Sequence, residues 1–170
     1  MTVQLFTDAA DAETLEVLGS TMALLATAEQ TGDAYEAVLV DSGPGGDLVP
    51  HRHPWEEMYF GVEGTMEVQV GRRIRTLGPG SLVTLPARCL HAFRVTSDSA
   101  RFLHVSIGRG AVDAFRDLHA HVPPDPTPDD LETLLQVLDR HQIEVVVPSA
   151  ADPVERVTVR GPAARPISTR

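Results

Sequence analysis

The chain has 170 residues, of which 42% are hydrophobic and 22% charged, as is ordinary for one globular domain with a short appendage. Its net charge of −10 argues against a broad nucleic-acid-binding face, because phosphate binding needs a basic surface. No apolar run approaches the roughly 20 residues of a membrane span, and the absence of lysine excludes a lysine Schiff base or a lysine general base.

The first residues give no targeting signal. Residues 1–13 lack the basic start and the apolar stretch of a signal peptide. Cys89 is the single cysteine, so no disulfide can form within the chain. We therefore expect a cytoplasmic protein that does not bind membranes.

Residues 20–41 are compatible with two structures. Their alanines and leucines favour a helix, whereas residues 31–33 form a turn signal between two apolar runs. Residues 35–40 also alternate as in a strand. We interpret the segment as a strand, a turn and a second strand, followed by a glycine-rich loop over residues 42–46.

Between residues 64 and 107, glycine and proline divide the chain into short apolar runs. We expect strands over residues 64–70, 73–77, 81–85, 91–95 and 101–107, with a turn at residues 97–98 before the last. Gly71-Arg72 fits a two-residue hairpin with glycine first. Short strands spaced about 8–12 residues apart predict an antiparallel sandwich or closed barrel.

The pattern becomes helical after Gly110. A helix is predicted over residues 111–122, and Thr127 is predicted to cap a second helix with Pro128 at its first position. Four leucines recur at helical spacing and are expected to pack against the β domain: Leu131, Leu134, Leu135 and Leu138. The β-branched run over residues 143–147 is expected to add an edge strand.

These patterns predict three segments. The β domain occupies residues 1–110, and a helical extension packed on it occupies residues 111–147. Residues 148–170 form a tail rich in proline and arginine. We interpret the tail as a solvated terminus, with a partner-docking segment as the alternative.

The stretch GDLVPHRHPWEEMYFGVEG, residues 46–64, places two histidines one residue apart. Because strand side chains alternate between faces, His51 and His53 point the same way, with Cα atoms ~6.6 Å apart. Two such imidazoles can reach one ion at about 2.0–2.1 Å from each nitrogen. Glu57 shares their parity, whereas Glu56 points to the opposite face and is expected to be solvated or in a salt bridge.

Residues 45–64 resemble the first motif of the cupin superfamily, G-x5-H-x-H-x3,4-E-x6-G, at every defined position. The matching residues are Gly45, His51, His53, Glu57 and Gly64. The second motif, G-x5-P-x-G-x2-H-x3-N, is similar to residues 80–95, with Gly80, Pro86 and His91 at their usual places. Arg88 and Val95 stand where glycine and asparagine are usual. The resemblance covers about residues 35–108.

The resemblance implies an all-β fold, the double-stranded β-helix or jelly-roll cupin barrel, with the C-terminal helices outside the motifs. It implies one divalent metal ion per chain, held by His51, His53, Glu57 and His91. Such a ligand set leaves positions open on a six-coordinate ion and suits Fe, Mn, Ni, Cu or Zn. The resemblance also implies a homodimer formed through edge strands.

The similarity to flavonol-cleaving cupins such as quercetin dioxygenases implies a dioxygenase-type oxidoreductase. Its substrate would be a small aromatic or enolisable molecule, and Glu57 would also act as the catalytic base. One alternative is a non-redox metalloenzyme of the isomerase or polyketide-cyclase type, whose metal acts as a Lewis acid. Another is a non-enzymatic cupin that binds a small molecule. The sequence leaves the metal and the substrate open.

Further pocket candidates rest on strand parity. Tyr59 and Phe93 share the parity of the neighbouring ligand residues and are expected to line the substrate pocket, although ordinary core packing is equally compatible. His104 could face the pocket, but a lone strand histidine is more often a structural polar residue, so it is left out of the catalytic set. Cys89 is interpreted as a buried inert cysteine, with a thiolate ligand as the alternative.

Overall fold

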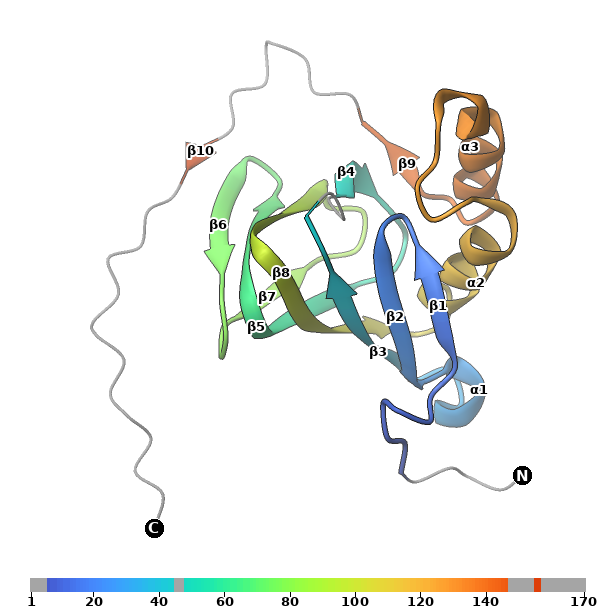
Figure 1. The fold of residues 1–170 in the computed structure, drawn as a ribbon, viewed down its shortest axis with the longest axis horizontal. Coiled ribbons are helices and arrows are strands. Elements are labelled where there is room, and N and C mark those ends of the chain that lie inside the picture. The colour runs from blue at the N-terminus through green and yellow to red at the C-terminus, as the bar shows by residue number, and fades with distance from the viewer. Residues whose placement is uncertain (1–5, 45–47, 147–154, 157–170) are drawn as a thin grey trace.

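The computed structural model describes residues 6–44, 48–146 and 155–156 (Figure 1). The strands are β1 (Thr14–Val17), β2 (Ser20–Ala26), β3 (Tyr35–Ser42), β4 (Leu48–Arg52), β5 (Glu57–Val70), β6 (Arg73–Leu77), β7 (Leu82–Leu85), β8 (His91–Ile107), β9 (Glu144–Val145) and β10 (Glu155–Arg156). The helices are α1 (Ala28–Thr31), α2 (Ala111–His121), the 3₁₀ helix η1 (Pro128–Asp130) and α3 (Leu131–Arg140).

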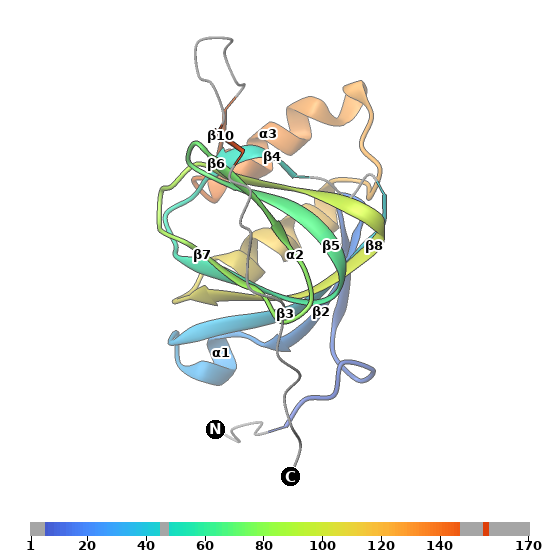
Figure 2. The same cartoon turned by 90° about the vertical axis from the view of Figure 1, so that its left-hand side faces the viewer.

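The strands form one curled sheet in which β8 is the central element. The order is β1-β2-β3-β8-β5-β6-β10, while β4 also pairs with β8 and β7 pairs with β5. All pairs are antiparallel except that of β10 with β6. Figure 2 shows the strands wrapping around a shared interior. The predicted all-β jelly-roll architecture with C-terminal helices is therefore confirmed.

β8 is longer than the sequence pattern predicts. It runs without interruption from His91 to Ile107, so the prediction of a turn at residues 97–98 is wrong. The polar residues there serve the pairing with β5: the Ser97 hydroxyl accepts the backbone N–H of Thr65 at 2.8 Å. This bond lies at a register shift between Gly64 and Met66, where the ladder bends. Polar side chains thus shape a bulge instead of ending the strand.

Gly64, the last glycine of the first motif, sits at this bend for two physical reasons. Its φ of +69° is the left-handed conformation that favours glycine, and an added Cβ would lie 2.0 Å from the Ser99 carbonyl oxygen. Gly71 has a φ of +58° but open space around its Cα. An added side chain would therefore meet both backbone strain and a steric clash at Gly64, but backbone strain alone at Gly71. Gly45, at the other end of the motif, lies outside the described residues.

We expect Gly64→Ala to lower the free energy of unfolding by about 3 kcal/mol or more, because strain and a backbone clash add together. Gly71→Ala should cost about 1 kcal/mol, since only the strain remains. Gly43→Ala, which meets no atom within 4 Å, should stay within about 0.5 kcal/mol. Urea unfolding measures all three, and equal losses at residues 64 and 71 would contradict the packing argument.

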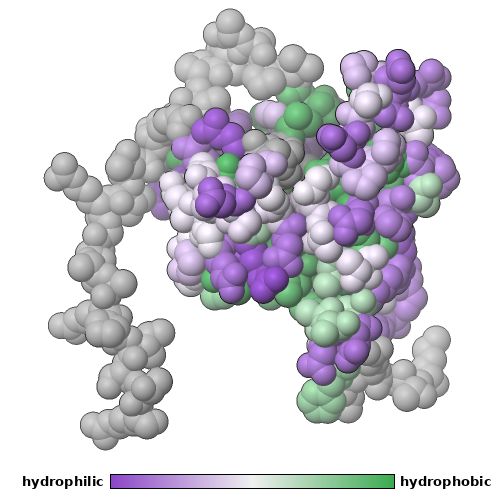
Figure 3. Space-filling view, viewed as in Figure 1, coloured by the Kyte–Doolittle hydropathy of each residue, from purple (hydrophilic) through white to green (hydrophobic). Residues whose placement is uncertain are grey.

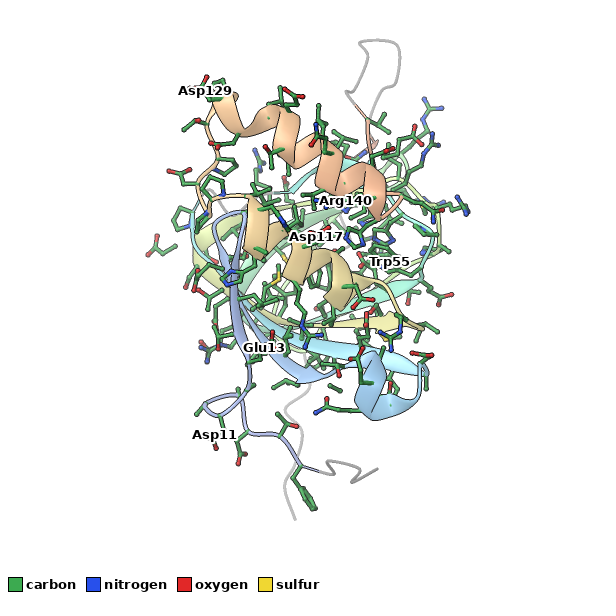
Figure 4. The ribbon with its side chains drawn as sticks, turned by 90° about the vertical axis from the view of Figure 1, so that its right-hand side faces the viewer. Asp11, Glu13, Trp55, Asp117, Asp129 and Arg140 are labelled. Atoms are coloured by element: carbon green, nitrogen blue, oxygen red, sulfur yellow. The ribbon has the colours of Figure 1, made fainter. Side chains whose placement is uncertain are left out.

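The two longer helices pack on one side of the barrel (Figure 4). Their buried residues Val112, Leu118, Val137 and Leu138 belong to the same hydrophobic cluster as the inner faces of the strands. Asp117 of α2 accepts a hydrogen bond from His141 Nε2 at 2.9 Å and lies 3.4 Å from Arg140 Nε. The helices are thus tied both to the barrel and to each other.

The sequence predictions for α3 are partly correct. Thr127 caps the start, but it caps η1, where its N–H donates to Asp130 Oδ2 at 2.8 Å. Leu138 is buried, whereas Leu131 and Leu135 remain 52% and 48% exposed, so their expected packing is wrong. The side of α3 that packs on the barrel is formed by Val137 and Leu138, with Leu134 partly buried.

Three remaining segment predictions have different outcomes. The expected strand–turn–strand over residues 20–41 is present as β2 and β3, with the short helix α1 before the turn. The expected edge strand is present as β9, which pairs with β4. Most of the tail lies outside the described residues, apart from β10. None of the described helices combines the length and apolarity required to cross a membrane.

Candidate metal centre

Three imidazoles meet at the end of the barrel where β4 and β8 pair. His51 in β4 lies opposite His91, the first residue of β8, and His53 follows β4 directly. One ring nitrogen of each histidine lies within 4.8 Å of the other two. The structure therefore brings together all three histidines that the sequence singles out.

Each of these histidines is held by the backbone. Nδ1 donates to a carbonyl oxygen two residues away, at 2.8 Å in His51, 3.1 Å in His53 and 2.9 Å in His91. Because a carbonyl only accepts, Nδ1 carries the proton and Nε2 presents a lone pair. Fixing the second nitrogen in this way is how proteins orient imidazole ligands of transition metals.

Glu57 faces the same cluster. It is 3% exposed, and its oxygens lie 3.1 Å from His91 Nε2 and 3.3 Å from His53 Nε2. His91 Nε2 is buried and makes no hydrogen bond of good geometry. Lone pairs on a carboxylate and an imidazole at this distance repel each other unless a cation lies between them. The residues therefore fit a divalent metal ion.

Glu56 occupies the other face of the chain, as its parity predicts. Its side chain is exposed, whereas Glu57 is buried. Tyr59, two residues further along β5, is buried with Glu57 on the inner face.

Glu57 also accepts hydrogen bonds from residues outside the three-histidine cluster. Its Oε1 accepts the Tyr59 hydroxyl at 2.7 Å, and its Oε2 accepts His104 Nε2 at 2.7 Å and Trp55 Nε1 at 3.4 Å. A carboxylate can only accept, so the proton of the His104 contact lies on Nε2. Three donors from three positions thus fix the carboxylate plane.

Electrostatics favour an ionised Glu57. Burial alone would raise its pKa, but the charge and hydrogen bond of His104, with contacts from His53 and His91, hold the pKa of Glu57 well below its usual value. Burial, and then the negative charge of Glu57, raise the pKa of Tyr59 well above the ordinary phenol value. Tyr59 is therefore a neutral donor to a charged acceptor.

The pKa values of His51 and His91 are shifted in opposite directions. Burial, followed by the charge of His91, lowers the pKa of His51 to about 4. Burial has the same tendency at His91, but the contact with negatively charged Glu57 outweighs it and raises the pKa of His91. Positive charge is thus favoured beside Glu57, where we expect the metal, while His51 keeps a free lone pair.

Two residues that contact the site were not assigned to it from sequence: His104 was considered and left out of the catalytic set, and Trp55 was not considered. His104 contacts Glu57 directly, although its parity on the strand was the only signal available. Trp55 stacks on His53, with ring centroids 4.1 Å apart and planes inclined by 11°. The tryptophan also packs against Ala111 and Ala114 of α2, and Figure 4 labels its position beside that helix.

Two other sequence candidates lie next to the site. Phe93 is 5% exposed and packs edge-on against Tyr59 within the hydrophobic core. Cys89 is half-buried and supplies the backbone carbonyl that holds His91. Among the described residues, the histidine cluster contains no thiol.

Arg88 stands at the position where cupins usually have glycine. Its backbone adopts the left-handed conformation that favours glycine. Its φ is +61°, and its N–H donates to the His53 carbonyl oxygen at 2.7 Å. The arginine side chain is exposed, so only the backbone strain of a left-handed non-glycine residue is added. The turn that leads to His91 is therefore preserved.

Comparison with known proteins agrees with this geometry. Residues 38–106 match the cupin domain family. The chain is 37% identical over 62 residues to a 5-nitrosalicylic acid 1,2-dioxygenase from a Bradyrhizobium species, covering 36% of this chain and 30% of that protein. It is 25% identical over 137 residues to quercetin 2,3-dioxygenase from Bacillus subtilis (strain 168), covering 76% and 41%. The chain thus spans less than half the length of either relative.

A solved structure shares the fold. The polyketide cyclase RemF from Streptomyces resistomycificus superposes with a TM-score of 0.54 at 22% identity, covering 61% of this chain and 79% of that one. At this identity the likeness concerns the fold alone.

Proposed function

We propose that this chain, whose residues 38–106 match the cupin domain family, is a metal-dependent, dioxygenase-type oxidoreductase acting on a small aromatic or enolisable substrate. The observation that carries the proposal is the buried Glu57, whose pKa is held low, beside three histidines whose Nδ1 atoms are bound to the backbone. Both curated relatives named above are dioxygenases of aromatic compounds. A cytoplasmic location, expected from the sequence, stays part of the proposal.

In this proposal His51, His53, His91 and Glu57 hold one divalent Fe, Mn, Ni, Cu or Zn ion per chain. When bound, a redox-active metal supplies the site at which an enolate-type substrate and dioxygen meet. Glu57 is the general base that removes the substrate hydroxyl proton, since it is ionised at neutral pH. The neutral Tyr59 hydroxyl donates to Glu57 and orients it during that transfer.

Trp55 and α2 would exclude water from this proton transfer. The indole covers one face of His53, and α2 covers the indole through Ala111 and Ala114. Exclusion of water strengthens the interaction of the carboxylate with a substrate proton. Tyr59 and Phe93 stay the proposed pocket residues, and they pack edge-on against each other.

A non-redox metalloenzyme is the second candidate, favoured by the fold shared with a polyketide cyclase. Glu57 would then take a proton next to a carbonyl polarised by the metal. A cupin that only binds a small molecule is the third candidate. Its ionised base would have no reaction to perform.

Metal analysis followed by oxygen uptake with a panel of flavonols and enols separates these candidates. We expect iron, manganese, nickel or copper in the purified protein and substrate-dependent uptake that a chelator abolishes. Zinc without uptake would favour the non-redox enzyme, provided that a panel compound is converted under nitrogen. Binding without conversion in either gas would contradict both enzymatic proposals.

We also propose that the protein is a homodimer paired through an outer apolar face, in place of the edge strands implied by the resemblance. This face is defined by the exposed residues Tyr35, Phe60, Leu82 and Ile107 on β3, β5, β7 and β8. Tyr35 pairs with Ile107 and Phe60 pairs with Leu82 across the sheet, and Figure 3 shows apolar surface interspersed with polar surface along the lower edge of the barrel. A monomer seldom exposes so many large apolar side chains together.

A second copy is the occupant that the charges favour. The cations at the two ends of the face, Arg101 and Arg109, are already paired with Asp41 and Asp33 at 2.7 and 2.8 Å. Because these two cations already have partners, an identical copy would leave neither of them unpaired, even though each chain carries −10.

Phe60→Asp is expected to convert the dimer to a monomer. The symmetric interface would have to bury two unpaired aspartates, one from each chain. Light scattering after size-exclusion chromatography at micromolar concentration measures the mass. Leu131→Asp, at a leucine of α3 that is 52% exposed against 40% for Phe60, is the control and should remain dimeric. A monomeric wild-type protein would contradict the proposed pairing.

A further inference from the structure

Some arginines of this acidic chain have no acidic partner among the described side chains. Most described arginines lie between 2.5 and 3.4 Å from a carboxylate oxygen: Arg52, Arg94, Arg101, Arg109, Arg116 and Arg140. The exceptions, whose side chains are exposed, are Arg72, Arg73, Arg75 and Arg88. Acidic residues outnumber basic ones 24 to 14, so composition does not explain unpaired cations. We call these exceptions the arginine rim.

The arginine rim begins in the same row of the sheet as two of the clustered histidines. His51 pairs with His91, which pairs with Val70. Val70 in turn pairs with Arg73, so the row crosses β4, β8, β5 and β6. Directly opposed residues of antiparallel strands share a face. Strands are ~4.8 Å apart, which places the Cα atom of Arg73 about 10 Å from that of His91 along the sheet.

Arg75 takes the same face of β6 one row further on. It lies opposite Val68, which is 2% exposed, and Leu77, of the same parity, is 5% exposed. β6 is close to the end of the strand order, on the side of the barrel away from α2 and α3 (Figure 1). Arg73 and Arg75 therefore share the face of core residues but remain exposed to solvent.

Arg88 brings another cation to this region from the turn that precedes β8. Its N–H donates to the His53 carbonyl oxygen at 2.7 Å, and Leu90 of the same turn accepts the N–H of Gly71 at 2.6 Å. The second bond joins this turn to the hairpin that carries Arg72. Arg88 also keeps a φ of +61°, which is strained for arginine. Strain of this kind, at a side chain without an ion-pair partner among the described residues, indicates a function.

Protection of a sheet edge is one structural explanation for such arginines, because inward charges discourage strand aggregation. It accounts for Arg73 and Arg75, but not for Arg88, which lies in a turn bonded to His53. An anion site accounts for all of them. A guanidinium binds a carboxylate through two parallel N–H bonds, and a local excess of positive charge attracts anions to a site.

We propose that the arginine rim binds the carboxylate of a small organic acid and holds the rest of that molecule toward the metal centre. The inference rests on the proposed function for the reacting part of the substrate and adds the group by which the substrate is recognised. An extended arginine side chain spans more than one strand spacing, so Arg73 can reach a ligand that lies over Val70. Each exposed guanidinium contributes modestly, and selectivity for an acid arises from several together.

Salicylate and salicylamide are suitable probes, since both have a phenol on a planar ring and only salicylate is charged. Calorimetric titration of the purified protein should give salicylate an affinity about tenfold or more above that of salicylamide. Raising sodium chloride from about 20 to 200 mM should weaken salicylate binding severalfold and leave salicylamide binding unchanged, because exposed charges are screened. Equal affinities for the two probes would overturn the proposal.

Substitutions on β6 separate the arginines from the metal. The double variant Arg73→Gln, Arg75→Gln should bind salicylate about tenfold more weakly and salicylamide within about twofold of the wild type, with unchanged metal content. Arg94→Gln is the matched control, because it removes the same charge from the neighbouring β8. Arg94 lies opposite Glu67 on the outer face, 2.7 Å from its carboxylate. An equal loss of salicylate affinity in this control would indicate a general charge effect and overturn the proposal.

Arg88→Gly supplies a readout that a structural role would not give. Glycine relieves the left-handed strain, so the urea midpoint should rise or hold while salicylate affinity falls about threefold to fivefold. Unchanged salicylate affinity in this variant and in the double variant would refute the arginine rim. Self-association of the double variant with undiminished affinity would assign Arg73 and Arg75 to edge protection instead. The titrations need no turnover, so a lack of oxygen uptake would contradict the proposed reaction and leave this result intact.

Discussion

Protein purified with His53→Ala is expected to contain almost no metal, against about one divalent ion per chain in the wild type. His53 offers its Nε2 to the site because its Nδ1–H is bound to the backbone, and Trp55 stacks on the ring. Alanine removes the ligand and leaves only two of the three clustered imidazoles, His51 and His91, beside Glu57. Elemental analysis of the purified variant and wild type measures the metal directly.

The control for this prediction is His121→Ala. His121 is an exposed histidine of α2 that lies 2.9 Å from Asp117 and away from the cluster. Its loss should leave the metal content unchanged. Undiminished metal in His53→Ala would show that the ion is held elsewhere.

Glu57→Gln is expected to reduce substrate-dependent oxygen uptake by about 10²–10⁴-fold, the range attributed to a general base. An amide cannot take up the substrate proton. It also presents an NH₂ group toward His104 or Tyr59, both of which donate to the carboxylate. We therefore expect a lower free energy of unfolding as well, by about 1–3 kcal/mol.

The adjacent glutamate supplies the matched control. Glu56 is exposed and lies on the opposite face of the chain, so Glu56→Gln should retain wild-type uptake and stability. Steady-state uptake at saturating substrate, normalised to metal content, measures both variants. Equal rates for Glu57→Gln and the wild type would remove Glu57 from the role of base.

The proposed ligand set could be predicted from sequence because it depends on short-range geometry and on the motifs. The alternation of a strand places His51 and His53 on one face and separates Glu57 from Glu56. The cupin motifs added His91, which lies opposite His51 across the β4–β8 pair. None of these inferences needed the packing of distant elements.

His104 and Trp55 were harder to assign because their roles arise from packing. His104 reaches Glu57 only through the pairing of β8 with β5, and Trp55 meets α2 only because that helix covers the barrel. A lone polar residue on a strand does not reveal which partner it meets across the interior. The polar run of residues 96–99 was misread for the same reason, since its partners lie on β5.

The central claim is that one metal ion is held by three histidines and Glu57. The most direct measurement is anomalous diffraction from crystals of the metal-loaded protein, collected at the absorption edge of its own metal. We predict one anomalous peak per chain, bonded to Nε2 of His51, His53 and His91 and to a carboxylate oxygen of Glu57. A peak at any other position, or a cluster of these residues without a peak in protein shown to contain metal, would contradict this assignment.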